Sequence, residues 1–206
     1  MPSKLQLPER KRTKKKLAIF SFFAGVGFLD LGFEQSGFDV VFVNEIHQPF
    51  LKGYRAARAG LKIKEPIFGY HEEDINQLLG KKGEQELKIK LKKARNQYQL
   101  VGFIGGPPCP DFSVGGKNRG REGKNGILSQ TYVDLIIAQK PDFFLFENVK
   151  GLWRTKRHRE FYEKLKNQLS DAEYIFTERL INAIEYGAPQ DRDRIILIGL
   201  KKNLFK

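Results

Sequence analysis

The sequence predicts an α/β fold built on a largely parallel β-sheet. Short apolar runs alternate with segments whose apolar residues recur at helical spacing, and this alternation continues along the chain after residue 16. Turns rich in glycine or proline follow two of the apolar runs, at Ala24–Gly27 and at Gly105–Pro110. In α/β proteins the loops at the carboxyl ends of parallel strands carry the functional side chains, so these two turns are the first places to search for a site.

Strands are expected where short apolar runs rich in β-branched and aromatic residues are bounded by turn residues. In chain order these runs are 17–23, 39–43, 67–70, 100–104, 142–146, 174–181 and 194–200. The run Phe143–Phe146 contains no polar residue, as expected of a strand that is buried on both faces.

Helices are expected where apolar residues recur three or four positions apart. The first follows the glycine turn and extends to Phe38, and the others lie at 48–59, within 74–93, at 131–139 and at 159–169. The segment 74–93 is rich in lysine and glutamate, which indicates a solvated helical face. The polar, glycine-rich segment 115–126 predicts a mobile functional loop.

The composition limits the class of protein. A chain of 206 residues is the size of one domain with a substantial core. A single cysteine excludes an intramolecular disulfide framework and favours a reducing compartment, so we expect a cytoplasmic, nucleoid-associated protein, or a nuclear one in a eukaryote. The basic first 16 residues, expected to form a flexible arm, lack the apolar segment of a signal peptide, and no apolar run approaches the length of a membrane span.

The charge points to the kind of partner. A formal net charge of +13 predicts a polyanionic partner, with nucleic acid favoured over an acidic membrane surface, although a basic surface kept for solubility is the alternative. The three histidines, His47, His71 and His158, are scattered and form no metal-ligand spacing with the single cysteine, so we interpret them as surface or packing residues and expect no metal.

The cysteine and one glutamate form the first candidate site. Cys109 follows two prolines at the end of a predicted strand, where a thiol is held still and can act as a nucleophile. The alternative, a small buried apolar residue, does not require Gly-Gly-Pro-Pro before it. Glu147 follows another strand, and the carboxyl ends of parallel strands share one edge of a sheet, so Glu147 is expected near Cys109 as a proton donor that also holds a substrate ring. A surface carboxylate or a helix cap is the alternative for Glu147.

The turn Phe23–Gly27 and two acidic residues form the second candidate site. Glycines between a strand and a helix let a ligand approach the backbone, although a tight strand-to-helix turn explains them equally well. Glu45 ends the second strand about twenty residues later, where an acidic side chain typically receives ribose hydroxyls. Asp74, which precedes Ile75, has the chemistry to hold an adenine amino group, and a helix N-cap is an equal alternative.

The segment Gln190–Arg194 forms the third candidate site. Arg192 and Arg194 alternate on an extended segment, so both side chains point the same way and can clamp a phosphate, a base edge or the catalytic carboxylate. An edge strand with ion pairs to Asp191 and Asp193 is the alternative.

Taken together and in this order, the segments resemble the carbon-5 cytosine methyltransferases. The motifs that carry the resemblance are Phe23–Gly27, Asn44-Glu45, Asp74-Ile75, Gly106–Ser113, Glu147–Val149 and Gln190–Arg194. The resemblance spans roughly residues 17 to 200 and implies the Rossmann-like fold of S-adenosylmethionine-dependent methyltransferases, with a mixed, mostly parallel seven-stranded sheet and helices on both faces. Residues 17–206 would form the catalytic domain.

The resemblance also implies a role for each motif. S-adenosylmethionine is the implied methyl donor, and its implied contacts are Phe23, Ala24, Gly25, Gly27, Leu29, Glu45, Ile46, Asp74, Ile75, Gly106, Pro108 and Leu128. Cys109 becomes the nucleophile, Glu147 the partner of the cytosine ring, and Arg192 and Arg194 the support of Glu147. The implied nucleic-acid contacts are Ser113, Gly115, Lys117, Arg119 and Gln190.

The implied activity is methylation of carbon 5 of cytosine in double-stranded DNA through a covalent Cys109 adduct, as the catalytic subunit or fragment of a restriction-modification-type enzyme. An RNA methyltransferase acting on tRNA, and an inactive fragment that binds nucleic acid or a partner, are the alternatives. Because no target-recognition domain or final family motif is found before Lys206, we expect either that a second polypeptide supplies them or that this is a truncated form. Pro110 replaces the usual glutamine after the cysteine and is expected to alter loop closure, and Phe28 replaces a common glycine and is expected to narrow the glycine turn.

Overall fold

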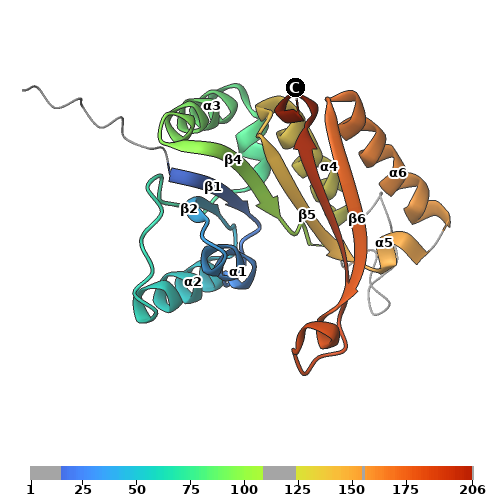
Figure 1. The fold of residues 1–206 in the computed structure, drawn as a ribbon, viewed down its shortest axis with the longest axis horizontal. Coiled ribbons are helices and arrows are strands. Elements are labelled where there is room, and N and C mark those ends of the chain that lie inside the picture. The colour runs from blue at the N-terminus through green and yellow to red at the C-terminus, as the bar shows by residue number, and fades with distance from the viewer. Residues whose placement is uncertain (1–14, 109–123, 155, 206) are drawn as a thin grey trace, which may run out of the picture.

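The computed structural model describes residues 15–108, 124–154 and 156–205 (Figure 1). The predicted nucleophile Cys109 lies outside the described residues, together with Pro110, Ser113, Gly115, Lys117 and Arg119. The first strand begins at Lys15, two residues inside the expected arm, because Lys15 pairs with Tyr98 of a neighbouring strand.

One seven-stranded sheet forms the centre of the molecule, with the order β3-β2-β1-β4-β5-β7-β6. Its strands are β1 (Lys15–Phe22), β2 (Asp39–Asn44), β3 (Tyr70–His71), β4 (Tyr98–Gly105), β5 (Phe143–Val149), β6 (Tyr174–Asn182) and β7 (Asp193–Lys201). Strands β1 to β5 pair in parallel, and β7 runs antiparallel to both β5 and β6. The mixed, mostly parallel sheet expected from the sequence is confirmed.

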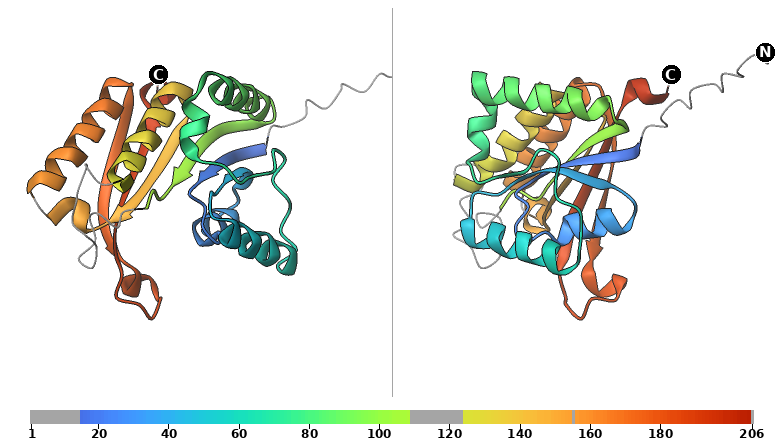
Figure 2. Two further views of the ribbon diagram at one scale, coloured as in Figure 1. Left: turned by 180° about the vertical axis from the view of Figure 1, so that it is seen from behind. Right: turned by 90° about the vertical axis from the view of Figure 1, so that its left-hand side faces the viewer.

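Helices cover both faces of the sheet (Figure 2). The α-helices are α1 (Phe28–Gln35), α2 (Gln48–Gly60), α3 (Lys81–Arg95), α4 (Lys124–Gln139), α5 (Gly151–Arg154) and α6 (Lys156–Asp171), and the short 3-10 helices are η1 (Ile75–Leu79), η4 (Ala183–Tyr186) and η5 (Lys202–Phe205). Buried residues of α3, α4 and α6 share the larger core cluster with one face of the sheet, and α1 packs on the opposite face against Ile19 and Ile104.

Several elements differ from those expected. Strand β3 forms at Tyr70–His71 rather than at 67–70, because these are the residues that pair with Val43 and Asn44 of β2. Helix α4 begins at Lys124, so the predicted loop 115–126 is wrong for its last three residues. Within this helix Ser129 is fully buried and accepts a hydrogen bond from Asn148. The polar, glycine-rich sequence does not reveal this tertiary contact. The helix expected within 74–93 is divided into η1 and α3, because Gly80 between them is extended. Glu147 and the two residues after it belong to β5 rather than following it, because Val149 still pairs with Arg194 of β7.

Candidate active site

A cavity opens where β1, β2 and β4 end at the same edge of the sheet. Its volume is about 410 Å³, within the range of small-molecule sites. It is lined by Phe23, Gly25, Asn44, Glu45, Ile46, His47, Phe50, Glu73, Asp74, Ile75, Gly106, Pro108 and Leu128. The three strands are parallel neighbours in the order β2-β1-β4, so their carboxyl ends bring together Phe23 and Gly106, which are 83 positions apart in the sequence.

The glycine turn after β1 has an unusual backbone. Phe23, Gly25 and Gly27 all have positive φ angles, of 53°, 57° and 90°. Two of the three are glycines, the residue that adopts this region without strain. Nothing lies within 4 Å of the position that a Cβ would take at Gly25, so the backbone here borders open space and is accessible to a ligand.

Glu45 ties this turn to the start of α2. Its side chain is 8% exposed; Oε2 accepts a hydrogen bond from the backbone N–H of Gly25 and Oε1 accepts one from that of His47, each at 2.8 Å. A carboxylate offers about four lone-pair sites, and these two bonds occupy two of them. Glu45 can therefore hold the turn in place and still accept hydrogen bonds from a ligand in the cavity.

Asp74 acts as the N-cap of η1. Its Oδ1 accepts hydrogen bonds from the backbone N–H and the side-chain Nδ2 of Asn76, each at 2.8 Å. The alternative interpretation of Asp74 as a helix cap is therefore confirmed, and its side chain also borders the cavity beside Ile75. Capping fixes the orientation of the carboxylate, which is compatible with a second role toward a ligand.

Nine of the twelve predicted donor contacts line this one cavity: Phe23, Gly25, Glu45, Ile46, Asp74, Ile75, Gly106, Pro108 and Leu128. The other three lie behind it. Ala24 packs against a small core cluster that includes Val43, Gly27 borders a separate pocket beside α2, and Leu29 packs against the sheet.

The cavity also contains four residues that were not predicted as contacts: Asn44, His47, Phe50 and Glu73. His47 and Phe50 begin α2 directly after the acidic end of β2, and this position was the signal available in the sequence. Their rings lie 4.5 Å apart, centroid to centroid, so His47 belongs to the cavity wall rather than to a remote surface. Phe28 is 81% exposed and lines the separate pocket, so it does not narrow the cavity.

Glu147 and Arg194 form an ion pair beside this cavity. Nε of Arg194 lies 2.6 Å from Oε1 of Glu147. Burial lowers the pKa of Arg194, and the adjacent Glu147 carboxylate opposes that shift. The other carboxylate oxygen, Oε2, lies 2.6 Å from the position that a Cβ would take at Gly106. Gly106 lines the cavity, so Glu147 and the cavity meet at this glycine.

The remaining predicted residues of the third segment lie apart from this pair. Arg192 has an exposed side chain and precedes β7; its backbone N–H donates to Asn182 and its carbonyl accepts from Ala183. Gln190 is exposed in the same connection. Asp193 pairs with Lys150 at 2.8 Å. Strand β7 begins at Asp193, so Arg194 lies within the strand and Arg192 directly before it.

Two further findings concern the described part of the chain. Its histidine, aspartate and glutamate side chains form no cluster of three that could hold a metal ion. Its helices include none with the length and apolar character needed to cross a bilayer.

Curated proteins that are similar in sequence to this chain are named as methyltransferases. A type II methyltransferase of Neisseria meningitidis serogroup C, M.NmeDI, is 58% identical over 92% of this chain and 45% of its own length. M.MthTI of Methanothermobacter thermautotrophicus is 35% identical over 90% of this chain and 49% of its own. The chain thus spans about half the length of the curated relatives it matches.

Solved structures show the same fold. A crystal structure described as a prophage-encoded DNA modification methyltransferase of E. coli superposes with a TM-score of 0.70 at 30% identity, over 92% of this chain and 48% of that one. Spodoptera frugiperda DNMT2, at 20% identity and a TM-score of 0.64 over 92% of this chain and 51% of that one, supports the fold alone. The model of the C-5 cytosine-specific DNA methylases matches residues 17–206, and the chain therefore belongs to that family.

Proposed function

We propose that this chain carries the catalytic part of an enzyme that transfers a methyl group from S-adenosylmethionine to carbon 5 of cytosine in DNA. The observation that carries the proposal is the junction at Gly106, where a cavity lined by nine predicted donor contacts adjoins the Glu147–Arg194 pair. The names of the relatives, which are methyltransferases, support the reaction class.

The residues of the cavity fit the chemistry of the donor. Ile46, Ile75 and Leu128 supply apolar walls for a purine ring, and the Glu45 carboxylate has lone pairs left for the ribose hydroxyls. Asp74 can accept from the adenine amino group, and the open backbone at Gly25 leaves room for the methionine end. When bound, S-adenosylmethionine supplies an electrophilic methyl group on a sulfonium sulfur.

The chain's own residues activate the base. Carbon 5 of cytosine is too electron-poor to attack a methyl group, so the Cys109 thiolate adds to carbon 6 and forms a C6–S bond. The displaced electron density moves toward N3, where Glu147 donates a hydrogen bond or a proton. Carbon 5 is then nucleophilic. Carbon 5 would form its bond to the methyl group as the sulfonium S–methyl bond breaks. A water molecule would then take the carbon-5 proton, whose bonding pair restores the 5,6 double bond; the C6–S pair returns to Cys109, and Glu147 recovers its proton from N3.

Arg194 and the loop residues support this step. Arg194 holds Oε1 of Glu147, which leaves Oε2 on the side of Gly106, toward the cavity. The target base cannot be reached within a duplex and must be extruded, at a cost of a few kcal/mol. We assign contacts with the nucleic acid around the extruded base to Ser113, Gly115, Lys117, Arg119 and Gln190.

A trapping experiment tests the proposal. A DNA duplex carrying 5-fluorocytosine has no carbon-5 proton to lose, so the covalent adduct persists and is detected by denaturing electrophoresis and intact mass spectrometry. We expect an adduct with S-adenosylmethionine and the wild-type chain, assayed together with the polypeptide that supplies the target-recognition domain, and none with Cys109→Ser. An adduct with RNA but not with DNA would favour the tRNA alternative, and no adduct with either would overturn the proposal.

A further inference from the structure

Behind the glycine turn, on the side away from the donor cavity, five polar side chains form a cluster that joins β1, α1 and α2. We call it the Asp30 cluster; its members are Ser21, Asp30, Glu34, Tyr54 and Arg58. Asp30 is only 1% exposed. Its Oδ1 accepts a hydrogen bond from Ser21 Oγ at 2.7 Å, and its Oδ2 accepts one from the Tyr54 hydroxyl at 2.6 Å. A buried carboxylate is costly to keep, so its presence requires an explanation.

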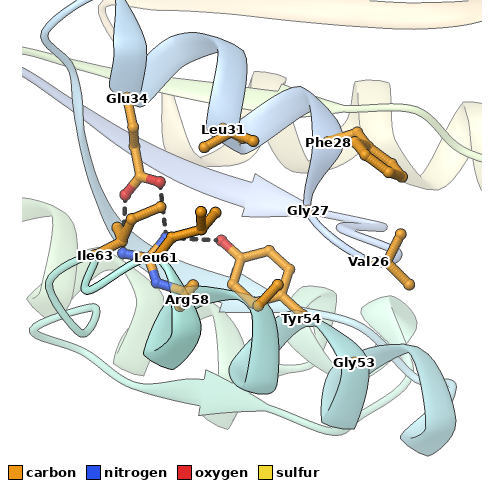
Figure 3. A pocket seen from close by; sticks show the side chains of 11 residues that line it. Val26, Gly27, Phe28, Leu31, Glu34, Gly53, Tyr54, Arg58, Leu61 and Ile63 are labelled. Carbon is orange, nitrogen blue, oxygen red and sulfur yellow. Dashed lines mark hydrogen bonds and ion pairs between the residues drawn. The ribbon is translucent and has the colours of Figure 1, made fainter.

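The Tyr54 ring contacts the glycine turn directly. A Cβ added at Gly27 would lie 2.5 Å from both Cδ2 and Cε2 of Tyr54, so the ring occupies the space beside this glycine (Figure 3). Gly27 is the N-cap of α1 and has a φ of 90°. The turn is therefore held from two sides, by Glu45 through Gly25 on the cavity side and by Tyr54 through Gly27 on the other.

Arg58 and Glu34 fix the orientation of Tyr54. Nη1 of Arg58 donates to the Tyr54 hydroxyl at 3.3 Å and to Oε2 of Glu34 at 2.9 Å, and Nη2 lies 2.8 Å from Oε1 of Glu34. Arg58 also donates to the backbone carbonyl of Lys64. The Tyr54 hydroxyl thus accepts one hydrogen bond and donates another, and together these bonds fix the position of the hydroxyl end of the ring.

The charges in the cluster support this arrangement. Burial raises the pKa of Asp30 to about 6, although hydrogen bonds from Tyr54 and Ser21 and the nearby Arg58 lower it and Glu34 raises it. Burial, followed by the proximity of Asp30, raises the pKa of Tyr54. At neutral pH the Asp30 carboxylate is therefore ionised and the Tyr54 hydroxyl is neutral, and a hydrogen bond from a neutral donor to an ionised acceptor is strong.

We propose that Tyr54 and Asp30 are positioning residues of the donor site, which hold the glycine turn against α2 so that Gly25 stays in register with Glu45. The inference rests on the proposed function. Apolar side chains would fill the same volume without burying a charge, but they would not anchor the end of the ring that packs beside Gly27. The hydrogen bonds of the hydroxyl do anchor it, and so keep the ring against the turn.

The test uses the full chain and S-adenosylhomocysteine as the probe, with its Kd measured by calorimetry at pH 7.5. Tyr54→Phe keeps the ring but removes the hydrogen bond to Asp30, and we expect affinity to fall roughly tenfold, the effect of one hydrogen bond to a charged group. The matched control is Tyr98→Phe, because Tyr98 is 1% exposed, against 2% for Tyr54, and donates at 2.8 Å to a carboxylate, that of Asp39, outside the cavity. We expect the control to lower the melting temperature but to keep the Kd within about twofold of the wild-type value.

The two proposals fail in different ways. If the wild-type chain does not bind S-adenosylhomocysteine, the donor site of the proposed function is wrong. If the wild-type chain binds and Tyr54→Phe binds equally well, the donor site stands and the positioning role is overturned; an equal loss in Tyr98→Phe would overturn it too, by showing general destabilisation. If Tyr54→Phe does not fold, Glu34→Gln is the second variant, because it weakens the ion pair with Arg58 and leaves Tyr54 in place. An unchanged Kd for S-adenosylhomocysteine in that variant would count against the proposal. In turnover assays Tyr54→Phe should raise the donor KM and leave kcat nearly unchanged.

Discussion

The side chains of Glu147 and Arg194 meet diagonally across two antiparallel strands. Glu147 of β5 pairs in register with Ile196 of β7, and Arg194, two residues earlier on β7, lies on the same face with its Nε 2.6 Å from Oε1 of Glu147. Because β7 is antiparallel to β5, it is the beginning of β7 that reaches the edge where the parallel strands end. The antiparallel strand β7 therefore places the Arg194 guanidinium at the same edge of the sheet as the carboxyl ends of the parallel strands.

Removing Arg194 should impair the chemical step more than donor binding. In Arg194→Ala the Glu147 carboxylate loses the group that orients it, and we expect methyl transfer to fall by about a hundredfold or more, the usual range for a general acid. Arg194 is not among the described residues that line the cavity, so the Kd for S-adenosylhomocysteine should stay within about twofold. Methyl incorporation into DNA and calorimetry measure the two effects. Arg179→Ala, at an exposed site on β6, is the comparison, and an equal loss of turnover there would contradict the role given to the ion pair.

A methyl group at Gly106 should displace Glu147. The new Cβ would lie 2.6 Å from Oε2 of Glu147, a separation that real Cβ atoms do not adopt, so the carboxylate must move. We expect Gly106→Ala to lose turnover by more than about tenfold, since a misplaced catalytic group is costly. Gly32→Ala is the control, because nothing lies within 4 Å of its Cβ position in α1 and alanine favours the helix by roughly 1 kcal/mol. Turnover and melting temperature distinguish the variants, and normal turnover in Gly106→Ala would show that Glu147 does not act from this position.

Replacing Glu45 with glutamine should weaken donor binding. The two carboxylate oxygens accept from the N–H groups of Gly25 and His47, and an amide NH₂ in one of those positions would face another donor. The lost charge-assisted hydrogen bond corresponds to about 1.5–3 kcal/mol, or roughly a 10- to 100-fold higher Kd for S-adenosylhomocysteine by calorimetry. Glu72→Gln removes the same charge from an exposed position outside the cavity and should bind like the wild type. Equal affinities of the Glu45 variant and the wild type would rule out this contact.

Asp30 should make the stability of the fold depend on pH. Its folded-state pKa is about 6 against an ordinary value of 3.8, so between these pH values the folded state holds a proton that the unfolded state lacks. The corresponding stability is fully present below pH 3.8 and is lost as the pH rises through 6. A gap of about two pKa units amounts to about 3 kcal/mol.

The variant Asp30→Asn removes that titration. Urea unfolding of both proteins at several pH values from 4 to 7.5 gives the difference in their free energies of unfolding. The wild-type protein should lose up to about 3 kcal/mol relative to the variant as the pH rises across this interval. Parallel pH profiles for the two proteins would show that Asp30 keeps an ordinary pKa in the folded state.

The order of strands and helices, the parallel character of the sheet and the motif residues followed from the sequence, because apolar periodicity and turn residues act over short distances along the chain. Local pattern also placed Glu45 at the end of β2, but it placed Glu147 after β5, whereas Glu147 lies within that strand. It failed at Lys124–Gly126, where a glycine-containing polar segment is helical because the helix packs against β5 through Ser129 and Asn148.

Tertiary structure alone decided which residues share a cavity and which face away. Ala24 and Gly27 belong to the same motif as Phe23 and Gly25, and Leu29 follows it in α1. Yet Ala24 and Leu29 pack in the core and Gly27 borders the neighbouring pocket. His47 and Phe50 join the cavity only because β2 and β1 are neighbours in the sheet. The spacing of apolar residues along the sequence distinguishes helices from strands. The contacts between Tyr54 and Gly27 and between Arg194 and Glu147 depend instead on the order and direction of the strands, which the sequence of a single segment does not specify.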